Sequence, residues 1–245
     1  MKIAFVINDM STEKPVYTTV RLAMDAVRRG HQVWLISVAD FTYEKDETVH
    51  ALAYPAPAKR FRSPNTFLAS MQSEKAVPSR IAVEELDVLM LRNDPADETG
   101  YRAWAKSAGI IFARVAQRSG LIVLNDPDGL AEAMDKMYVH LLPATVRPNA
   151  IITQSRDEVK AFVKDVGGKA VLKGMQGTGH QSMFLVTPDN RANLNQMIEA
   201  ITRDDYLIAE EYIPEAEQGS TRIFLLNGEP LRHNGKYAAF QWVRK

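Results

Sequence analysis

The sequence has no cysteine, no excess charge of either sign and no long hydrophobic run. Without cysteine there can be no disulfide, no thiolate nucleophile and no Cys-ligated zinc or iron–sulfur site. The 30 basic residues balance the 30 acidic residues, whereas a general binder of nucleic acid or membrane surfaces would need a basic excess. No stretch approaches the roughly 20 apolar residues of a membrane span, and the apolar opening Lys2–Ile7 is too short for a signal peptide. We therefore expect a soluble, cytoplasmic protein that binds neither nucleic acid nor membranes.

The first half of the chain has the pattern of an α/β domain. The apolar run Lys2–Ile7 is followed by apolar residues at helical spacing, a stop at Gly30 and a second apolar run, Gln32–Ser37. A strand, a helix and a further strand in this order predict a βαβ unit, and hence an open parallel sheet. Further strands are expected at residues 87–92 and 121–124, with a helix at 104–118 between them. Residues 41–54 suggest a hairpin, and the Pro-bearing stretch 55–78 is left without elements.

The turn cluster at residues 125–129 predicts a domain boundary, so residues 1–126 form the first domain and residues 127–245 the second. The second domain has an α+β pattern. A helix is expected at residues 130–141, with others at 157–166 and 190–202. Strands are expected at residues 150–153, 169–173, 182–186, 206–211, 221–226 and 231–243.

A glycine-bearing loop joins two of these strands. The strand that ends at Lys173 runs into Gly174-Met-Gln-Gly-Thr-Gly-His, and the next strand follows. Glycines let backbone N–H groups approach phosphate oxygens closely, and a lysine adds a point charge. A Walker A loop would need Gly-Lys-Ser/Thr opening a helix, so that site is excluded here. No Gly-x-Gly-x-x-Gly follows the first strand, which argues against a dinucleotide site there. A plain glycine-rich hairpin turn stays open as the simpler interpretation.

Several short motifs follow one another in a characteristic order. Residues 89–95 read Leu-Met-Leu-Arg-Asn-Asp-Pro, residues 125–127 Asn-Asp-Pro, residues 211–214 Glu-Tyr-Ile-Pro and residues 227–230 Asn-Gly-Glu-Pro. Together with Lys136, Lys173 and the glycine loop, this set resembles the ATP-grasp ligases, and within them the bacterial glutathione synthetases, over all 245 residues. The resemblance implies an N-terminal open parallel-sheet (pre-ATP-grasp) domain and an incomplete α+β ATP-grasp domain. Its lid subdomain would cover about residues 143–205, and residues 206–245 would form the first part of its C-terminal subdomain.

The resemblance also implies a function. Such ligases use ATP and Mg²⁺ to convert a carboxylate into an acyl phosphate, which an amine attacks to give an amide. Glutathione synthetase itself joins γ-glutamylcysteine to glycine, but relatives differ in both substrates. Small-molecule carboxylate and amine substrates are therefore the expected partners, and a homo-oligomer is the expected assembly.

The resemblance also implies which residues of this sequence would form an ATP site, because they match the family's motifs. Lys136 and Lys173 would contact the phosphates, the segment from Glu210 to Ile213 would bind adenine through its backbone, and Arg222 would hold the substrate carboxylate or the acyl phosphate as the catalytic residue. Glu211 or Glu217 would hold the ribose hydroxyls. The nucleotide-binding residues expected from the resemblance are Lys136, Lys173, Gly177, Thr178, Gly179, Glu210, Glu211, Tyr212 and Ile213. Arg92, Asn93 and Asp94 would face the substrates, because open sheets bind ligands at strand ends. Solvated surface residues are the alternative interpretation for Lys136 and Glu217.

The sequence departs from the family pattern in four places. Gly174 replaces the usual proline, His180 the second loop glycine and Ser220 the usual acid two residues before Arg222. The family's glycine-rich substrate loop and its late Mg²⁺-binding strands are not found up to Lys245. The five histidines show no metal-binding spacing, so no metal ligand is assigned within the chain.

Three explanations of the missing segment stay open. The chain is a portion of a longer enzyme, which we favour, or another chain supplies the rest, or the protein is a degenerate relative. The alternative to a ligase is therefore a degenerate or partial ATP-grasp protein, which would act as a nucleotide-binding or partner-binding module.

Overall fold

The computed structural model describes residues 1–57, 60–176 and 183–243. Contacts divide them into two compact units, the first made of Met1–Leu141 with residue 176 and the second of Leu142–Met175 with residues 183–243. Residues 127–141 thus pack with the first unit, although the sequence pattern assigned them to the second domain. The domain boundary expected between residues 126 and 127 stays a prediction, because compact units need not coincide with sequence domains.

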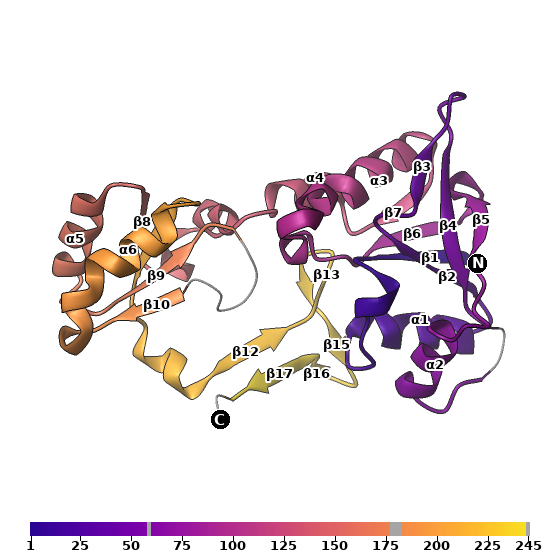
Figure 1. The fold of residues 1–245 in the computed structure, drawn as a ribbon. Coiled ribbons are helices and arrows are strands. Elements are labelled where there is room, and N and C mark those ends of the chain that lie inside the picture. The colour runs from indigo at the N-terminus through magenta and orange to yellow at the C-terminus, as the bar shows by residue number, and fades with distance from the viewer. Residues whose placement is uncertain (58–59, 177–182, 244–245) are drawn as a thin grey trace. The chain divides into compact units, whose positions relative to one another are not determined.

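Among the described residues the first unit has one sheet of seven strands, in the order β3-β4-β2-β1-β6-β7 with β5 beside β4 (Figure 1). The strands are β1 (Lys2–Ile7), β2 (Gln32–Ser37), β3 (Phe41–Tyr43), β4 (Val49–Pro55), β5 (Ser79–Ala82), β6 (Val88–Leu91) and β7 (Ile122–Leu124). Strands β2, β1, β6 and β7 are parallel, as the βαβ pattern predicted. Strands β3, β4 and β5 extend this sheet with antiparallel pairs, so the sheet is mixed at that edge.

Strands β1 and β6 are largely buried on both faces, which explains why they read as continuous apolar runs, whereas β7 at the edge of the sheet exposes Ile122 and Leu124. Along β1, Ala4 and Val6 belong to one core cluster and Phe5 and Ile7 to the other, because successive side chains point to opposite faces. Helix α3 (Ala108–Arg118) contributes to the first cluster. Helices α1 (Thr18–Arg28) and α2 (Pro64–Met71) contribute to the second.

Two helices differ from the sequence-based expectations. The stretch 55–78 contains α2, which begins at the N-cap Ser63 with a capping box and has Pro64 in its first turn. The helix expected at residues 130–141 is two short pieces, α4 (Pro127–Glu132) and the 3-10 helix Lys136–Leu141. Helix α4 begins early because Asp126 caps it by accepting from the Gly129 N–H at 2.7 Å.

The second unit has a four-stranded sheet, in the order β10-β9-β11-β8. Its elements are β8 (Ala150–Thr153), α5 (Arg156–Asp165), β9 (Ala170–Gly174), β10 (Met183–Val186), α6 (Leu194–Thr202) and β11 (Leu207–Glu211). Both helices pack on this sheet in one core cluster, through Val159 and Val163 of α5 and Ile198 of α6. Strand β9 is antiparallel to both β10 and β11, so the glycine loop joins paired neighbours.

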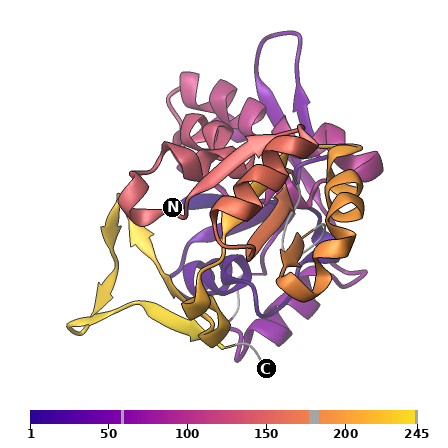
Figure 2. The same ribbon diagram turned by 90° about the vertical axis from the view of Figure 1, so that its left-hand side faces the viewer.

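The C-terminal residues form a ribbon of short strand pairs. They are β12 (Ser220–Ile223) with β17 (Ala239–Trp242), β13 (Leu225–Leu226) with β14 (Glu229–Pro230), and β15 (Arg232–His233) with β16 (Lys236–Tyr237). Figure 2 shows this yellow ribbon as an extended segment. All residues of these strands are exposed, with Leu225 and Leu226 exposed to 63% and 64%.

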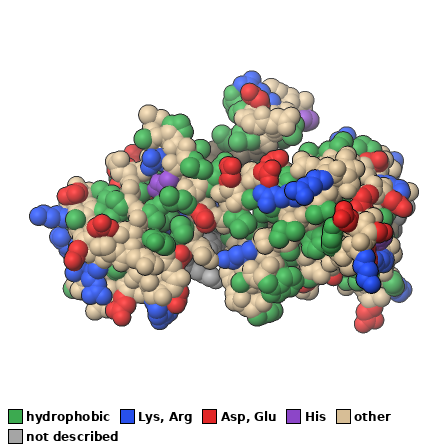
Figure 3. Space-filling model, turned by 90° about the horizontal axis from the view of Figure 1, so that it is seen from above, with side chains coloured by type: hydrophobic (Ala, Val, Ile, Leu, Met, Phe, Trp, Pro, Cys, Tyr) green, Lys and Arg blue, Asp and Glu red, His purple; other side chains and the backbone are tan. Residues whose placement is uncertain are grey.

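On the face shown in Figure 3, acidic, basic and apolar side chains are interspersed. Across the described ranges, no helix is long and apolar enough to cross a bilayer.

Candidate functional site

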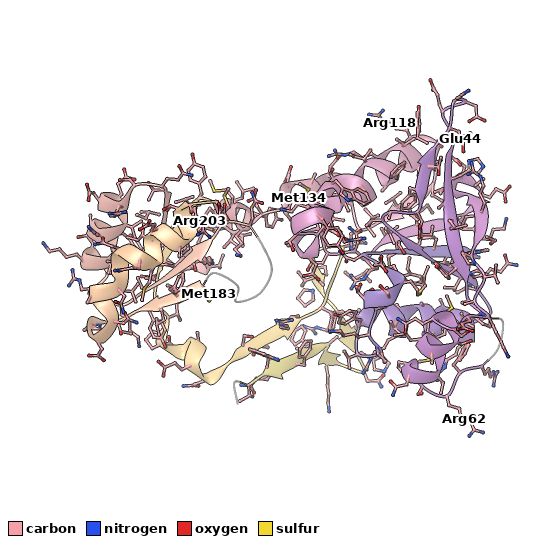
Figure 4. The ribbon with its side chains drawn as sticks, viewed as in Figure 1. Glu44, Arg62, Arg118, Met134, Met183 and Arg203 are labelled. Atoms are coloured by element: carbon pink, nitrogen blue, oxygen red, sulfur yellow. The ribbon has the colours of Figure 1, made fainter. Side chains whose placement is uncertain are left out.

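Lys173 and Glu210 form the central ion pair of the second unit. Lys173 lies near the end of β9, where its Cα pairs with Met183 of β10 (labelled in Figure 4), and Glu210 lies in the neighbouring β11. The Nζ of Lys173 is 2.6 Å from Oε1 of Glu210, and the two side chains are only 16% and 12% exposed. Two mostly buried charges need each other, because either alone would carry a large desolvation cost. The site therefore presents an ammonium whose direction is fixed by a carboxylate.

The carboxylate of Glu211 is held by Asn149. The backbone N–H of Asn149 donates to Oε1 and its side-chain Nδ2 donates to Oε2, both at 2.9 Å, and the Glu211 N–H donates back to the Asn149 carbonyl. The hydrogen bonds from the Asn149 backbone and side chain lower the pKa of Glu211. These bonds engage both carboxylate oxygens of Glu211, and the expected contact of Glu211 or Glu217 with the ribose hydroxyls stays a prediction. Asn149 itself was missed, since nothing in its sequence context singled it out.

A cluster of three side chains surrounds the segment that follows β11. The hydroxyl of Tyr212 donates to Oε1 of Glu217, and Lys169 Nζ lies 3.5 Å from the same oxygen. The ammonium of Lys169 also lies 3.6 Å from the centroid of the Tyr212 ring, a cation–π contact. The strand ladder ends at Glu211, and Ile213 continues with extended backbone angles of φ −99° and ψ 107°. The expected adenine-binding segment from Glu210 to Ile213, called the hinge below, thus begins in β11 and leaves the sheet after Glu211, where Tyr212 contacts Lys169.

The remaining predicted residues lie in other parts of the chain. Lys136 belongs to the first unit, where its Nζ donates to the Gln176 carbonyl at 3.2 Å. Arg222 is exposed on β12, which pairs with β17 and not with the sheet that carries Lys173. Gly177, Thr178, Gly179 and His180 lie outside the described residues. The convergence of Lys136 and Lys173 on one triphosphate therefore stays a prediction.

The described residues do not form a magnesium site. Within residues 1–57, 60–176 and 183–243, no group of three or more His, Asp or Glu side chains could hold a metal ion. The Lys173–Glu210 pair offers one carboxylate that is already neutralised. The donor set thus does not fit the hard, oxygen-rich shell that Mg²⁺ prefers, and we derive no catalytic step through the metal from these residues.

A second group of polar residues lies at the carboxyl ends of β1, β6 and β7. Arg92, Asn93 and Asp94 follow β6 directly and line a cavity of about 310 Å³. Asn125, after β7, and Met134 (labelled in Figure 4) contribute to the same cavity. Burial raises the pKa of Asp94. The residues predicted to face the substrates therefore lie together at the carboxyl ends of the strands, where open sheets bind ligands.

A buried charge network that the sequence analysis missed lies beside this edge. Glu98 is only 1% exposed and takes two bonds from Arg102, at 2.7 Å from Nε and 3.1 Å from Nη2. Asn8, which follows β1, donates from Nδ2 to Glu98 Oε1 and to the Asp94 carbonyl, both at 2.8 Å. The i, i+4 spacing of Glu98 and Arg102 was the available sequence signal. The network joins the ends of β1 and β6.

Comparisons with known proteins agree on one family. The model of the prokaryotic glutathione synthetase N-terminal domain matches residues 1–131, and that of the prokaryotic glutathione synthetase ATP-grasp domain matches residues 135–239. Glutathione synthetase of Gloeobacter violaceus is 31% identical over 234 residues, which cover 94% of this chain and 69% of that protein. The enzyme of Vibrio parahaemolyticus is 27% identical over 212 residues, which cover 86% of this chain and 62% of that protein.

Solved structures of low sequence identity share the fold. The D-cycloserine synthetase DcsG has a TM-score of 0.54 at 10% identity, over 89% of this chain and 62% of that one. The D-alanyl-alanine synthetase A of Vibrio cholerae also has a TM-score of 0.54 at 10% identity, over 99% of this chain and 67% of that one. This chain thus spans roughly two thirds of the length of the proteins it resembles.

Proposed function

Because the chain belongs to the prokaryotic glutathione synthetase family, we propose that it takes part in ATP-dependent amide formation between a carboxylate and an amine. Membership of an ATP-grasp family implies the use of ATP and Mg²⁺. In the proposed reaction a carboxylate oxygen attacks the γ-phosphorus of ATP and ADP leaves. The amine nitrogen then attacks the acyl carbon, phosphate leaves and the nitrogen loses a proton. γ-Glutamylcysteine and glycine are the substrates proposed first, because glutathione synthetases are the relatives.

The observation that carries this proposal is the 2.6 Å ion pair between Lys173 and Glu210. A triphosphate brings several oxygens with concentrated negative charge, which compete with the carboxylate for the ammonium. Glu210 then acts as the group that aims Lys173 before the nucleotide arrives. A pre-aimed ammonium loses less side-chain entropy on binding, which is the advantage of preorganisation.

The adenine contact is proposed for the backbone that follows β11. The Glu211 carbonyl would accept from the adenine amino group and the Ile213 N–H would donate to the ring, with Tyr212 between them. Asn149 supports this assignment, because its bonds to Glu211 fix the point at which the hinge leaves the sheet. Glu211 or Glu217 is the acid proposed for the ribose hydroxyls. Arg222 is proposed to hold the acyl phosphate, for which a guanidinium fork is suited.

A second candidate function is a nucleotide-binding or partner-binding module without turnover. One observation favours it: no metal-binding group occurs within the described ranges. Phosphoryl transfer relies on Mg²⁺ to offset the charge that develops on the phosphates.

The experiment that separates the two functions is ADP release with Mg²⁺, ATP, γ-glutamylcysteine and glycine. Turnover that is lost in Lys173→Ala and kept in Lys164→Ala, an exposed lysine of α5, supports the ligase. Lys173→Gln removes the charge but keeps a polar side chain beside Glu210. Loss of turnover in a folded Lys173→Gln variant would therefore be due to the lost charge and not to misfolding. Absence of turnover in a folded wild-type chain contradicts ligase activity of these 245 residues and supports the binding module.

A further inference from the structure

A small cavity of the second unit lies between its two helices. Its volume is about 200 Å³, and it is lined by Lys160 of α5, by Leu194 and Asn195 of α6, and by Arg191, which precedes α6. This volume is below that of most drug-sized ligand pockets, so the cavity suits a small ligand or one group of a larger one. None of the described residues that line it is acidic, whereas Lys160 and Arg191 are both positively charged.

The cavity and the Lys173–Glu210 pair belong to opposite faces of the sheet. Leu172 of β9 and Ala209 of β11 are part of the core cluster that the sheet forms with α5 and α6. Because successive side chains of a strand point to opposite faces, Lys173 and Glu210 point away from these helices. A ligand in the cavity would therefore not occupy the site that we propose for the nucleotide.

The two cations of the cavity have no acidic partner in the described part of the chain. Neither the ammonium of Lys160 nor the guanidinium of Arg191 forms a hydrogen bond or an ion pair with a described residue. In contrast, the exposed Arg29 and Arg203 each pair with an aspartate. Lys160 is half-buried, and an ammonium that is partly removed from water is stabilised by a counter-charge. A bound anion would supply that charge.

The segment that carries Arg191 is anchored to the end of β10. The backbone N–H of Thr187 donates to Oδ1 of Asn190, and Nδ2 of Asn190 donates to the Leu185 carbonyl, both at 2.8 Å. The 3-10 helix Pro188–Asn193 then leads directly into α6. Arg191 and Asn195 thus reach the cavity from an ordered backbone, and such preorganisation lowers the entropy that is lost on binding.

The donors of the cavity match a phosphate group. The ammonium, the guanidinium and the Asn195 amide together offer many N–H donors, and only Asn195 adds a side-chain acceptor. A phosphomonoester carries about 1.5 to 2 negative charges at pH 7, which balances the charges of Lys160 and Arg191. A carboxylate carries a single charge and would leave one of the two cations without compensation. The apolar side chain of Leu194 is compatible with the carbon atoms of an ester.

We propose that this cavity binds a phosphate group, either free or as a small phosphomonoester, with Lys160 and Arg191 as its charged partners and Asn195 as a further donor. A ligand held in this way connects α5 to the segment before α6, so it stabilises the second unit by mass action. The proposal goes beyond the ATP-dependent reaction and does not depend on it, because none of its residues belongs to the site proposed for the nucleotide.

The test is a titration of the full chain with sodium phosphate, followed by NMR at constant ionic strength. The reporters are the Nε–H signal of Arg191 and the side-chain amide signals of Asn195. Glycerol 3-phosphate is titrated in parallel to distinguish an ester from free phosphate, and sodium chloride is the control for ionic strength. We expect at least one of the two phosphate compounds to shift these signals to saturation. In Lys160→Gln the dissociation constant should rise about tenfold, the loss expected for one charge-assisted bond.

Lys164→Gln, at an exposed lysine one turn further along α5, is the matched control and should bind as the wild type does. Lys173→Gln should also keep the wild-type affinity for phosphate. Equal affinity of Lys160→Gln and the wild type, an equal response to chloride, or no response at millimolar phosphate would overturn the proposal. Binding that is lost in Lys173→Gln and kept in Lys160→Gln would also overturn it, because the phosphate would then occupy the nucleotide site. A melting curve shows whether Lys160→Gln is folded, and Arg191→Gln repeats the test from the other side of the cavity.

Discussion

Glu98 is the most deeply buried charged residue that the described part of the first unit shows, and its charge is paired on both oxygens. Its partners are Arg102 and Asn8, at distances of 2.7 to 3.1 Å. Burying a carboxylate is tolerable only with such partners, and removing the charge leaves the opposing guanidinium without compensation. The residue therefore ties the loop after β6 to the end of β1 through a single side chain.

The substitution Glu98→Gln keeps the shape and removes the charge. We predict a loss of about 2 kcal/mol in the free energy of unfolding, the scale of a buried charged hydrogen bond. Urea denaturation followed by circular dichroism measures this. Asp128→Asn removes one side of the exposed Arg114–Asp128 pair and should cost no more than about 0.5 kcal/mol. Equal effects of the two substitutions would refute the structural role of Glu98.

Glu13 should make stability depend on pH. Its pKa rises on folding from the ordinary 4.5 to about 7, so between these values the native state binds more protons than the unfolded state. Stability therefore falls as pH rises from about 4.5 to 7 and stays low above it. The contribution is about 1–2 kcal/mol after allowance for the partial exposure of the side chain.

Denaturant titrations of wild type and Glu13→Gln at pH 5 and pH 8 measure this effect. The variant should be the more stable protein at pH 8, with a smaller advantage at pH 5. Glu74→Gln, at an exposed acid of the same unit, should follow the wild type at both values. A difference between wild type and Glu13→Gln that does not change with pH would contradict the raised pKa.

The sequence predicted some of these residues and not others, for reasons that are physical. Lys173 could be singled out, because an ammonium at the end of an apolar strand needs a partner. That Glu210 is its partner became evident only from the register of β9 against β11 in the structure. Asn149 and Glu13 were missed, since their roles depend on contacts between segments distant in sequence.

At the scale of elements, local signals predicted the strands better than the helix ends. The buried parallel strands were evident from their apolar runs, and the β1–α1–β2 unit followed from its spacing. Helix α2 was not expected, because the stretch 55–78 that holds it is polar and contains prolines, and no strand was expected at β5, directly after that stretch. They form by pairing with β4 and by packing on α1, contacts that local sequence does not reveal.

Gly219 controls the pairing of β12 with β17. Its φ is +106°, and a Cβ built on it would lie 2.0 Å from the backbone oxygen of Trp242. Gly167 also has a positive φ, +80°, but its Cβ would meet nothing within 4 Å. We predict that Gly219→Ala separates these strands, whereas Gly167→Ala costs only about 1 kcal/mol of backbone strain.

Amide hydrogen exchange across β12 and β17 distinguishes the two glycine variants. Protection at Arg222, which pairs with Phe240, should be lost in Gly219→Ala and retained in Gly167→Ala. Retained protection in both variants would show that the close approach of Gly219 to Trp242 is not required for the pairing.

At the scale of the whole molecule, the proposed function assigns different ligands to the two units. The second unit carries the Lys173–Glu210 pair and the hinge proposed for ATP, and the first carries the cavity at the carboxyl ends of its strands. The sequence could predict both domains because their motifs occur in a fixed order. The C-terminal ribbon at residues 220–243 is exposed over all its strands.

The measurement that tests this account most directly is equilibrium binding of a non-hydrolysable ATP analogue by calorimetry, with Mg²⁺ present. We predict that the wild-type chain and Lys164→Ala bind with equal affinity. Lys173→Gln should weaken binding by about tenfold or more, because it removes the charge that meets the phosphates and leaves the fold intact. Unchanged affinity in Lys173→Gln, or no binding by the folded wild type, would contradict the claim that the second unit holds a nucleotide through Lys173.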